Sequence, residues 1–178
     1  FVGHVGTRSR GTVGGSIVHA DGGAELPLCL AALGGSIVVE GPNGRREISP
    51  EDFFVTHYVT TLEPGELVVE TVWPTARVGE GFAFEELALR AGDYALSMVA
   101  VCGTTVAVGA VTDRPTVLGE VGALLAGADT SSELAREAGA LAATLVDPPG
   151  HIHASPAYLK HLTGMLVERA LRRSWTSS

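Results

Sequence analysis

A glycine-rich stretch near the start of the chain holds residue types that can bind phosphate. Residues 10–16 read Arg-Gly-Thr-Val-Gly-Gly-Ser. Glycine has no Cβ, so a ligand can approach its backbone closely, and successive backbone N–H groups form a concave site for anions. Thr12 and Ser16 add hydroxyls, and Arg8 and Arg10 add positive charge just before them. The stretch is either a phosphate-binding loop or an ordinary tight turn.

The histidines and cysteines are less suggestive of chemistry. His151 and His153 have a spacing that a metal pair could use, but no carboxylate or cysteine clusters with them, so structural or helix-capping roles are expected. Cys29 and Cys102 each lie in an apolar segment. Both are expected to be buried free thiols, neither disulfide-bonded nor metal-bound. This use of cysteine fits a reducing, cytoplasmic compartment.

Composition limits the function classes. The chain has 178 residues, of which 46% are hydrophobic and 18% charged, as in a globular protein with a sizeable core. The formal net charge of −8 makes nucleic-acid binding unexpected. We find neither a signal peptide nor an apolar run long enough to span a membrane, so no membrane insertion is expected. The first residue is Phe1 and not methionine, as expected of a sequence that starts inside a longer protein.

The elements that must position these residues follow from periodicity and capping signals. Residues 12–20 are interpreted as the glycine turn and its exit. Strands are expected over residues 36–40, 45–48, 66–73, 82–90, 98–102 and 104–111. Helices are expected over residues 24–33, 118–125 and 130–145, after Ser49-Pro50, and from Ser155-Pro156 onward. Strands followed by helices predict an α+β fold, with helices packed on one side of a small antiparallel sheet.

A change in composition indicates where the chain divides. Residues 76–81 resemble a linker, which places a boundary near residue 78. We therefore expect one domain over residues 1–78 and a second over residues 79–178.

Four sequence blocks occur in order along almost the whole chain. They are R-G-T-V-G-G-S-I-V-H-A-D at residues 10–21, L-E-P-G-E-L-V at 62–68, F-E-E-L-A-L-R-A-G-D-Y-A at 84–95 and I-H-A-S-P-A-Y-L-K-H-L at 152–162. Together they resemble the FAD-binding medium subunit of molybdenum hydroxylases, the group of carbon monoxide, xanthine and nicotine dehydrogenases. The resemblance implies that the first domain is part of the second FAD-binding subdomain and that the second domain is the C-terminal flavoprotein domain.

The resemblance also implies an oxidoreductase function. In this family, hydroxylation at a molybdopterin centre in a large partner subunit releases electrons. They pass through 2Fe–2S clusters in a small partner subunit to FAD, and then to an acceptor. FAD is therefore the cofactor expected here, and molybdopterin and iron–sulfur clusters are expected only in the partner subunits. The flavin carries the redox chemistry, so this chain needs no catalytic acid or base and no metal ligand.

The site residues that the resemblance implies fall into two groups. The FAD diphosphate would be held by Thr12, Gly14, Gly15 and Ser16.

The second group would contact the rest of the cofactor. Asp21 and Glu25 would accept hydrogen bonds from ribityl or ribose hydroxyls, or would act only as a turn cap and a first-turn helix acid. Val68 would touch the isoalloxazine ring, or be an ordinary strand residue. Tyr94 would lie close to the flavin face, or belong to an interface or the core. Glu85 falls where some relatives have a lysine near the flavin, so that contact is not expected here.

Some features of the sequence depart from the family pattern. The family's N-terminal FAD subdomain carries an A-G-G-x-S/T pyrophosphate loop that this sequence lacks, so the FAD site is expected to be incomplete in this chain. Gly22-Gly23 replaces the usual Pro-Ala, and Ser16 stands where asparagine is common. Two alternatives therefore remain open: a non-catalytic scaffold or interaction module, and a repurposed small enzyme that binds another ligand between its subdomains.

Overall fold

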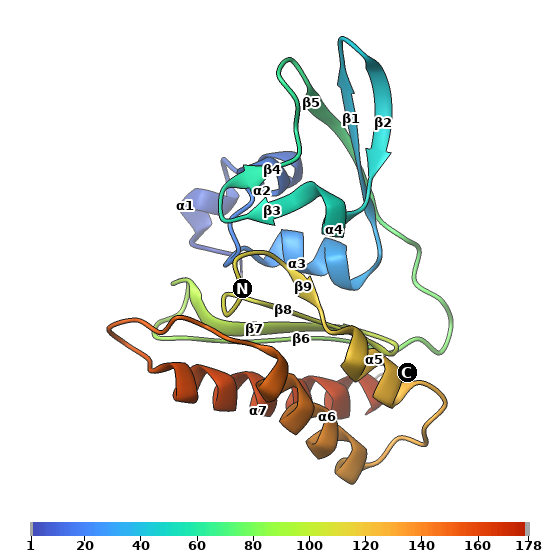
Figure 1. Ribbon diagram of the computed structural model, residues 1–178, viewed down its shortest axis with the longest axis vertical. Helices are drawn as coiled ribbons and strands as arrows, with labels where there is room; N and C mark the ends of the chain where they lie inside the picture. Colours follow the sequence, from blue (N-terminus) through green and yellow to red (C-terminus); the bar gives the residue numbers. More distant parts are fainter. Residues whose placement is uncertain (1, 177–178) are drawn as a thin grey trace.

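The computed structural model of the protein describes residues 2–176, which form an N-terminal lobe, a linker and a C-terminal lobe (Figure 1). The N-terminal lobe covers residues 2–72, and residues 73–81 form a linker without regular secondary structure that is exposed over residues 74–79. The C-terminal lobe covers residues 82–176. In Figure 1 the N-terminal lobe lies above the C-terminal sheet, and the two long C-terminal helices lie below that sheet.

The N-terminal lobe is built around a small antiparallel sheet. Its helices and strands are α1 (Val5–Arg8), α2 (Val13–His19), α3 (Glu25–Ala32), β1 (Ser36–Gly41), β2 (Gly44–Ile48), α4 (Pro50–Phe53), β3 (Phe54–Thr56), β4 (Val59–Thr60) and β5 (Leu67–Val72). The strand order is β2-β1-β5, and β3 pairs separately with β4. The core between this sheet and the helices is formed by Ile17, Leu30, Ile37, Val39, Phe53 and Phe54.

The C-terminal lobe is a four-stranded antiparallel sheet with the order β6-β7-β8-β9. Its elements are β6 (Phe82–Ala88), β7 (Ala95–Cys102), β8 (Thr105–Gly109), β9 (Thr116–Val117), α5 (Gly119–Leu125), α6 (Ser132–Leu145) and α7 (Pro156–Thr176). Helices α6 and α7 cover one face of the sheet (Figure 1). Small side chains let these two helices approach closely, because a Cβ on Gly139 would lie 2.5 Å from the carbonyl oxygen of Gly164.

Helix α3 covers the opposite face of the C-terminal sheet, although it belongs to the N-terminal lobe in sequence (Figure 1). Its residues Leu28 and Ala32 form an apolar cluster with Met98, Ala100 and Ala107. Leu30 lies on the other side of α3, in the core of the N-terminal lobe. The helix therefore joins two cores.

The structure confirms the predicted α+β class and most of the expected elements. A turn at residues 42–43 joins β1 to β2, in agreement with the two strands predicted there, and Ser49 and Ser131 cap α4 and α6 at the start of two predicted helices. The prediction that helices cover one side of the sheet was incomplete, because α3 covers the other side. The structure also contains α1, β3, β4 and β9, which the periodicity did not predict.

Two predictions about the glycine stretch and the cysteines need correction. The stretch is not a free turn, because residues 13–19 form helix α2. The Thr12 side chain caps this helix, which offsets the low helix propensity of its glycines. Cys29 and Cys102 are free thiols, but each is half-buried and not fully buried.

The longest apolar stretches lie within strands and short helices. Among residues 2–176, no helix has both the length and the hydropathy that crossing a membrane requires.

Candidate functional site

The first turn of α2 presents the predicted diphosphate-binding residues together. Thr12 has an extended backbone (φ −125°, ψ 155°), and its Oγ1 accepts a hydrogen bond of 2.9 Å from the N–H of Gly15. The N–H of Ser16 donates to the carbonyl oxygen of Thr12 over 3.1 Å. The amides at the start of a helix have no acceptor within the helix, so they can bind an external anion.

The two glycines of this turn face different surroundings. A Cβ on Gly15 would lie 2.8 Å from Thr12 Oγ1, so a side chain there would require the capping hydroxyl to shift. Among residues 2–176, no atom beyond the helix backbone lies within 4 Å of a Cβ placed on Gly14. The backbone at Gly14 is therefore open to an approaching ligand, whereas Gly15 serves the helix.

At the other end of α2, the chain turns and buries a carboxylate. Ala20 ends the helix in the left-handed conformation (φ 52°), and the next residue, Asp21, is only 6% exposed. Its Oδ1 accepts from the N–H of Gly23 over 2.9 Å, and its Oδ2 accepts from the Tyr58 hydroxyl over 3.3 Å. Asp21 therefore has partners within the protein before any ligand binds.

Tyr94 lies beside Asp21, as the contacts of Gly23 show. A Cβ on Gly23 would lie 3.3 Å from Tyr94 Cδ1 and 3.4 Å from Asp21 Oδ1. The Asp21 charge is the main cause that raises the pKa of Tyr94, followed by burial and a hydrogen bond to Asp21. The tyrosine is nevertheless 72% exposed, so it remains accessible to a ligand.

Glu25 and Val68 occupy different surroundings from these residues. Glu25 is the first residue of α3 and is half-buried. Its charge contributes, after burial, to raising the pKa of Glu86. Val68 lies on β5, where it packs against the core of the N-terminal lobe. Its contact with that core is an ordinary strand contact.

Glu85 faces α7 and forms ion pairs with two arginines of that helix. Its side chain is 5% exposed, with Oε2 3.0 Å from Arg169 Nε and Oε1 3.1 Å from Arg173 Nη1. The two arginines anchor β6 to α7.

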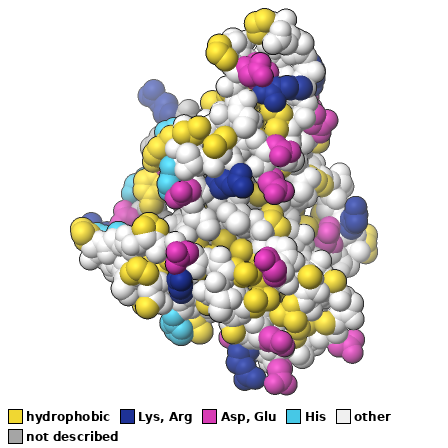
Figure 2. Space-filling model, viewed as in Figure 1, with side chains coloured by type: hydrophobic (Ala, Val, Ile, Leu, Met, Phe, Trp, Pro, Cys, Tyr) yellow, Lys and Arg dark blue, Asp and Glu magenta, His cyan; other side chains and the backbone are white. Residues whose placement is uncertain are grey.

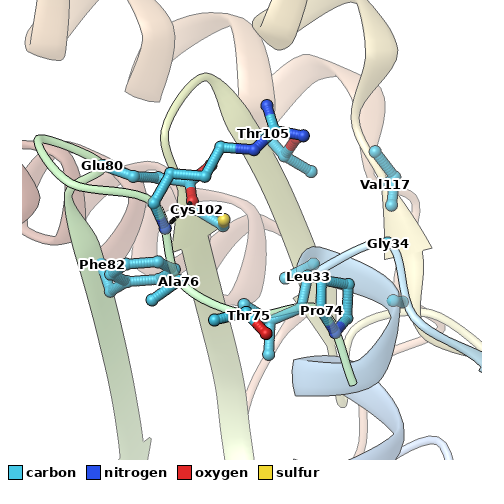
Figure 3. Close-up of a pocket in the computed structure, with 13 residues that line it drawn as sticks. Leu33, Gly34, Pro74, Thr75, Ala76, Glu80, Phe82, Cys102, Thr105 and Val117 are labelled. Atoms are coloured by element: carbon cyan, nitrogen blue, oxygen red, sulfur yellow. Dashed lines mark hydrogen bonds between the residues drawn. The ribbon is translucent and has the colours of Figure 1, made fainter. Parts of the chain in front are cut away.

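A separate cavity of about 460 Å³ lies between the linker, the end of α3 and the C-terminal sheet (Figure 3). Its polar lining comes from Thr75, Arg77, Glu80, Cys102 and Thr105. Burial, followed by a hydrogen bond to Glu80, raises the pKa of the Cys102 thiol to about 11. The thiol is therefore protonated near neutral pH and is a poor nucleophile. The residues that line this cavity differ from those predicted to bind FAD.

Charged side chains are scattered over the face shown in Figure 2, where acidic groups alternate with basic and apolar ones. Within residues 2–176, no group of three or more histidine, cysteine, aspartate or glutamate side chains could hold a metal ion.

Sequence reasoning missed Tyr58, which the structure places against Asp21. Tyr58 is also in the left-handed conformation (φ 59°), and its ring lies 4.9 Å from that of His19. A positive φ at a tyrosine leaves no mark in the sequence. The pairing with Asp21 could not be inferred either, because the two residues are 37 positions apart.

Family models match both lobes. The model described as "FAD binding domain in molybdopterin dehydrogenase" matches residues 1–76. The model described as "CO dehydrogenase flavoprotein C-terminal domain" matches residues 82–174. The first match contains α2 with its glycines, and the second contains the sheet and helices of the C-terminal lobe.

Similar proteins cover the chain almost completely. The 6-hydroxypseudooxynicotine dehydrogenase complex subunit alpha of Paenarthrobacter nicotinovorans is 35% identical over 98% of this chain and 62% of its own length. The carbon monoxide dehydrogenase medium chain of Hydrogenophaga pseudoflava is 33% identical over 94% of this chain and 62% of its own length. The chain thus spans somewhat less than two thirds of these relatives.

Solved structures agree with the sequence matches. Carbon monoxide dehydrogenase from Hydrogenophaga pseudoflava superposes with a TM-score of 0.94 and 31% identity, over 99% of this chain and 64% of that one. Quinoline 2-oxidoreductase from Pseudomonas putida 86 superposes with a TM-score of 0.90 and 34% identity, over 98% of this chain and 64% of that one. This chain belongs to the family of FAD-binding medium subunits of molybdenum hydroxylases, the carbon monoxide dehydrogenase flavoproteins.

Proposed function

We propose that this chain binds FAD as part of the medium subunit of a molybdenum hydroxylase, an oxidoreductase. The observation that carries the proposal is the capped glycine turn of α2, which lies inside the match to an FAD-binding domain and leaves the Gly14 backbone open. On the same observation, we propose that the protein takes part in the oxidoreductase activity of its relatives.

The residues present fit one side of an FAD site. We assign the diphosphate to the turn formed by Thr12, Gly14, Gly15 and Ser16. In this turn, the Thr12 hydroxyl is held by Gly15, and Gly14 offers backbone without a side chain. We assign the ribityl and ring end of the cofactor to Asp21, Glu25, Val68 and Tyr94. Of these, exposed Tyr94 is best placed for a contact, and buried Asp21 is the least accessible.

When bound, FAD supplies the redox chemistry, since it can accept electrons and hand them to an acceptor. This chain's residues bind and orient the cofactor. Both phenols are hydrogen-bond donors near neutral pH, and the Asp21 charge, the first cause of the shift, raises the pKa of Tyr58 and of Tyr94 further above that range. The chain therefore supplies position and neutral donors, with no acid or base that must change its protonation state.

The proposed partners are a large molybdopterin subunit and a small iron–sulfur subunit, which would deliver electrons to the FAD. The support is the similarity to a carbon monoxide dehydrogenase medium chain and to a dehydrogenase complex subunit. We also propose a cytoplasmic location, supported by two cysteines that form no disulfide with each other. The proposed domains are residues 1–78 and 79–178, and the exposed linker supports that division.

The test is to purify the assembled complex through a tag on this chain, and to record its visible spectrum. We expect a flavin spectrum and, after denaturation, release of FAD in an amount equimolar with the chain. A complex that contains the molybdenum and iron–sulfur centres but no FAD would contradict the proposal and favour a scaffold role.

A further inference from the structure

An exposed histidine caps a buried backbone N–H where the two lobes meet. Gly22 lies in the turn between α2 and α3 and is buried. Its N–H donates to His57 Nδ1 over 3.2 Å, and His57 is exposed. Together with Tyr58, His57 forms the two-residue turn of the β3–β4 hairpin. A side chain in contact with solvent therefore supplies the acceptor for a buried donor.

Three segments of the chain pack directly on the Gly22 backbone. The carbonyl oxygen of Gly22 accepts from the N–H of Ala110, directly after β8, over 2.8 Å. A Cβ on Gly22 would lie 2.7 Å from His57 Cε1 and 2.9 Å from the carbonyl oxygen of Asp113. No side chain fits at this point, so Gly22 joins the hairpin, the turn after α2 and the C-terminal lobe.

The hydrogen bond depends on a departure of this chain from the family pattern. Gly22-Gly23 stands where that pattern has Pro-Ala. Proline has no backbone N–H, so a proline in place of Gly22 would have no donor for His57. The donor and the acceptor are 35 positions apart in the sequence, and both must be present for the bond to form.

The protonation state of His57 decides whether this bond exists. A neutral imidazole can accept through its unprotonated nitrogen, whereas both nitrogens of an imidazolium are donors. A proton on His57 Nδ1 would therefore point at the N–H of Gly22, and the bond would break. The buried Gly22 N–H would lose its acceptor, which is costly for a buried donor.

Two carboxylates lie near the Gly22–His57 bond. Asp21 precedes Gly22, and Asp113 in the loop after β8 accepts from Thr56 Oγ1 through Oδ2, over 3.5 Å. Next to Asp113, Arg114 donates to backbone carbonyl oxygens of the N-terminal lobe. The other titratable rings here are Tyr58, 5.8 Å from the His57 ring, His19, 4.9 Å from the Tyr58 ring, and Tyr94, on which the Asp21 charge acts. Protonation of His57 therefore replaces its bond to Gly22 by attraction to nearby carboxylates.

We propose that Gly22 and His57 form a proton-controlled latch, which is closed while His57 is neutral and opens when His57 is protonated. Opening frees the Gly22 amide and loosens the hairpin from the turn after α2. The N–H of Tyr58 still donates to the carbonyl oxygen of Ala20 over 2.8 Å, so the hairpin stays attached. Because Gly22 also accepts from the C-terminal lobe, opening weakens the contact between the lobes. The latch requires no bound ligand and is independent of the proposed function.

Hydrogen exchange of the Gly22 amide in the full chain measures the latch. Its exchange rate, resolved by NMR and divided by that of an unstructured chain at the same pH, gives its protection. We expect protection to fall by about 5-fold between about pH 8 and about pH 5, since imidazoles gain a proton in this range and one hydrogen bond is lost. The Gly103 amide donates to the carbonyl oxygen of Gly81 over 2.9 Å and should keep its protection.

Two substitutions at His57 separate the acceptor from the proton. Asparagine offers Oδ1 as an acceptor and gains no proton in this range, so His57→Asn should keep Gly22 protected at every pH. Phenylalanine offers a ring without an acceptor, so His57→Phe should leave Gly22 poorly protected throughout. His161→Asn replaces an exposed histidine on α7 and is the matched control, which should keep the pH dependence of the unsubstituted chain.

The outcomes decide the proposal without the use of FAD. Equal protection of Gly22 at both ends of the pH range in the unsubstituted chain would overturn it. An undiminished pH dependence in His57→Asn would also overturn it, because another group would then be responsible. Circular dichroism at each pH checks that the fold persists. If His57→Phe does not fold, the comparison of His57→Asn with His161→Asn still decides, since asparagine retains an acceptor.

Discussion

Two neighbouring glycines, Gly14 and Gly15, have different structural roles in this molecule. Gly14 and Gly15 follow each other in the first turn of α2, but only Gly15 has the Thr12 hydroxyl in the way of a Cβ. Loss of a helix cap costs about 1 kcal/mol of stability. A side chain on the open glycine costs the helix nothing, because alanine favours a helix more than glycine does. Stability and cofactor binding can therefore be separated at these two positions.

We predict that Gly14→Ala reduces FAD binding without reducing stability. The added methyl group would occupy the surface that we assign to the diphosphate, and a loss of at least ~10-fold in affinity is expected, about 1.4 kcal/mol. FAD content and the thermal midpoint of the purified complex measure the two effects. Gly6→Ala in α1, which also meets open space, is the control. Unchanged FAD content in Gly14→Ala would show that the diphosphate lies elsewhere.

An ion pair on the N-terminal sheet should make stability depend on pH. Glu66 accepts from Arg46 Nε over 2.8 Å and from its Nη2 over 2.7 Å. These bonds, followed by one from the Glu63 N–H, lower the pKa of Glu66 from 4.5 to about 2. The stabilisation is complete above pH 4.5 and is lost as the pH falls towards 2, because the unfolded chain takes up the proton first.

Glu66→Gln should therefore flatten the pH dependence of stability in that range. Urea unfolding at pH 6 and at successive lower values compares the variant with the unsubstituted chain. The two curves should differ most at pH 6 and converge near pH 2. Parallel curves would mean that the ion pair does not persist in solution.

At the scale of secondary structure elements, the C-terminal helices depend on small residues and on one buried acid. Gly139 and Gly164 allow α6 and α7 to touch through their backbones. Glu85 joins β6 to α7 through Arg169 and Arg173. The close contact between α6 and α7, together with the Glu85 ion pairs, fixes the position of the sheet on these helices.

Gly139→Ala should destabilise the protein by about 2 kcal/mol, because overpacking forces the helices apart. Chemical denaturation measures the change. Gly119→Ala, in which the new Cβ meets open space, is the control and should have little effect. Equal stability of the two variants would show that the helices can separate at no cost.

Glu85→Ala should cost about 2 kcal/mol, since it removes charge-assisted hydrogen bonds from a buried acceptor. The same denaturation experiment applies. Glu133→Ala removes an exposed pair with Arg136 and should change stability by less than about 1 kcal/mol. If both variants lose the same stability, the Glu85 contacts contribute no more than an exposed pair.

Elements with local signals were predictable from the sequence. The alternation over residues 36–40 and 45–48 gave β1 and β2, and Ser49 before Pro50 gave the start of α4. Helix α2 was not predicted, because its glycines have a low helix propensity. The Thr12 cap offsets this low propensity in the folded chain. Of the candidate site, the residues carried by short motifs could be predicted. The Asp21–Tyr58 pair could not, since it depends on tertiary structure.

At the scale of the whole molecule, one arginine crosses from the C-terminal lobe to the N-terminal lobe. Arg114 Nη1 donates to the carbonyl oxygens of Glu51 and Phe54, over 2.9 and 2.8 Å. The N–H of Ala110 donates to the carbonyl oxygen of Gly22, the residue after Asp21, over 2.8 Å. The loop after β8 therefore holds the two lobes in one arrangement around the proposed site.

We predict that Arg114→Ala increases the rate at which trypsin cuts the linker after Arg77 by several-fold. The loss of both bonds lets the lobes separate and exposes the linker more often. Gel electrophoresis with mass spectrometry of the fragments measures the rate. Arg136→Ala, on the exposed side of α6, removes an arginine without touching the lobe interface. Equal cleavage of the two variants would show that Arg114 does not restrain the lobes.

Helix α3 also has a consequence for synthesis on the ribosome. It emerges long before β7 and β8, although Leu28 and Ala32 have their partners on those strands. Its apolar face stays exposed until the strands of the sheet have been synthesised. Folding intermediates with exposed apolar surface are prone to aggregate. The two lobes are thus consecutive in the chain but cannot mature one after the other, because the early lobe completes its packing only when the late one has been made.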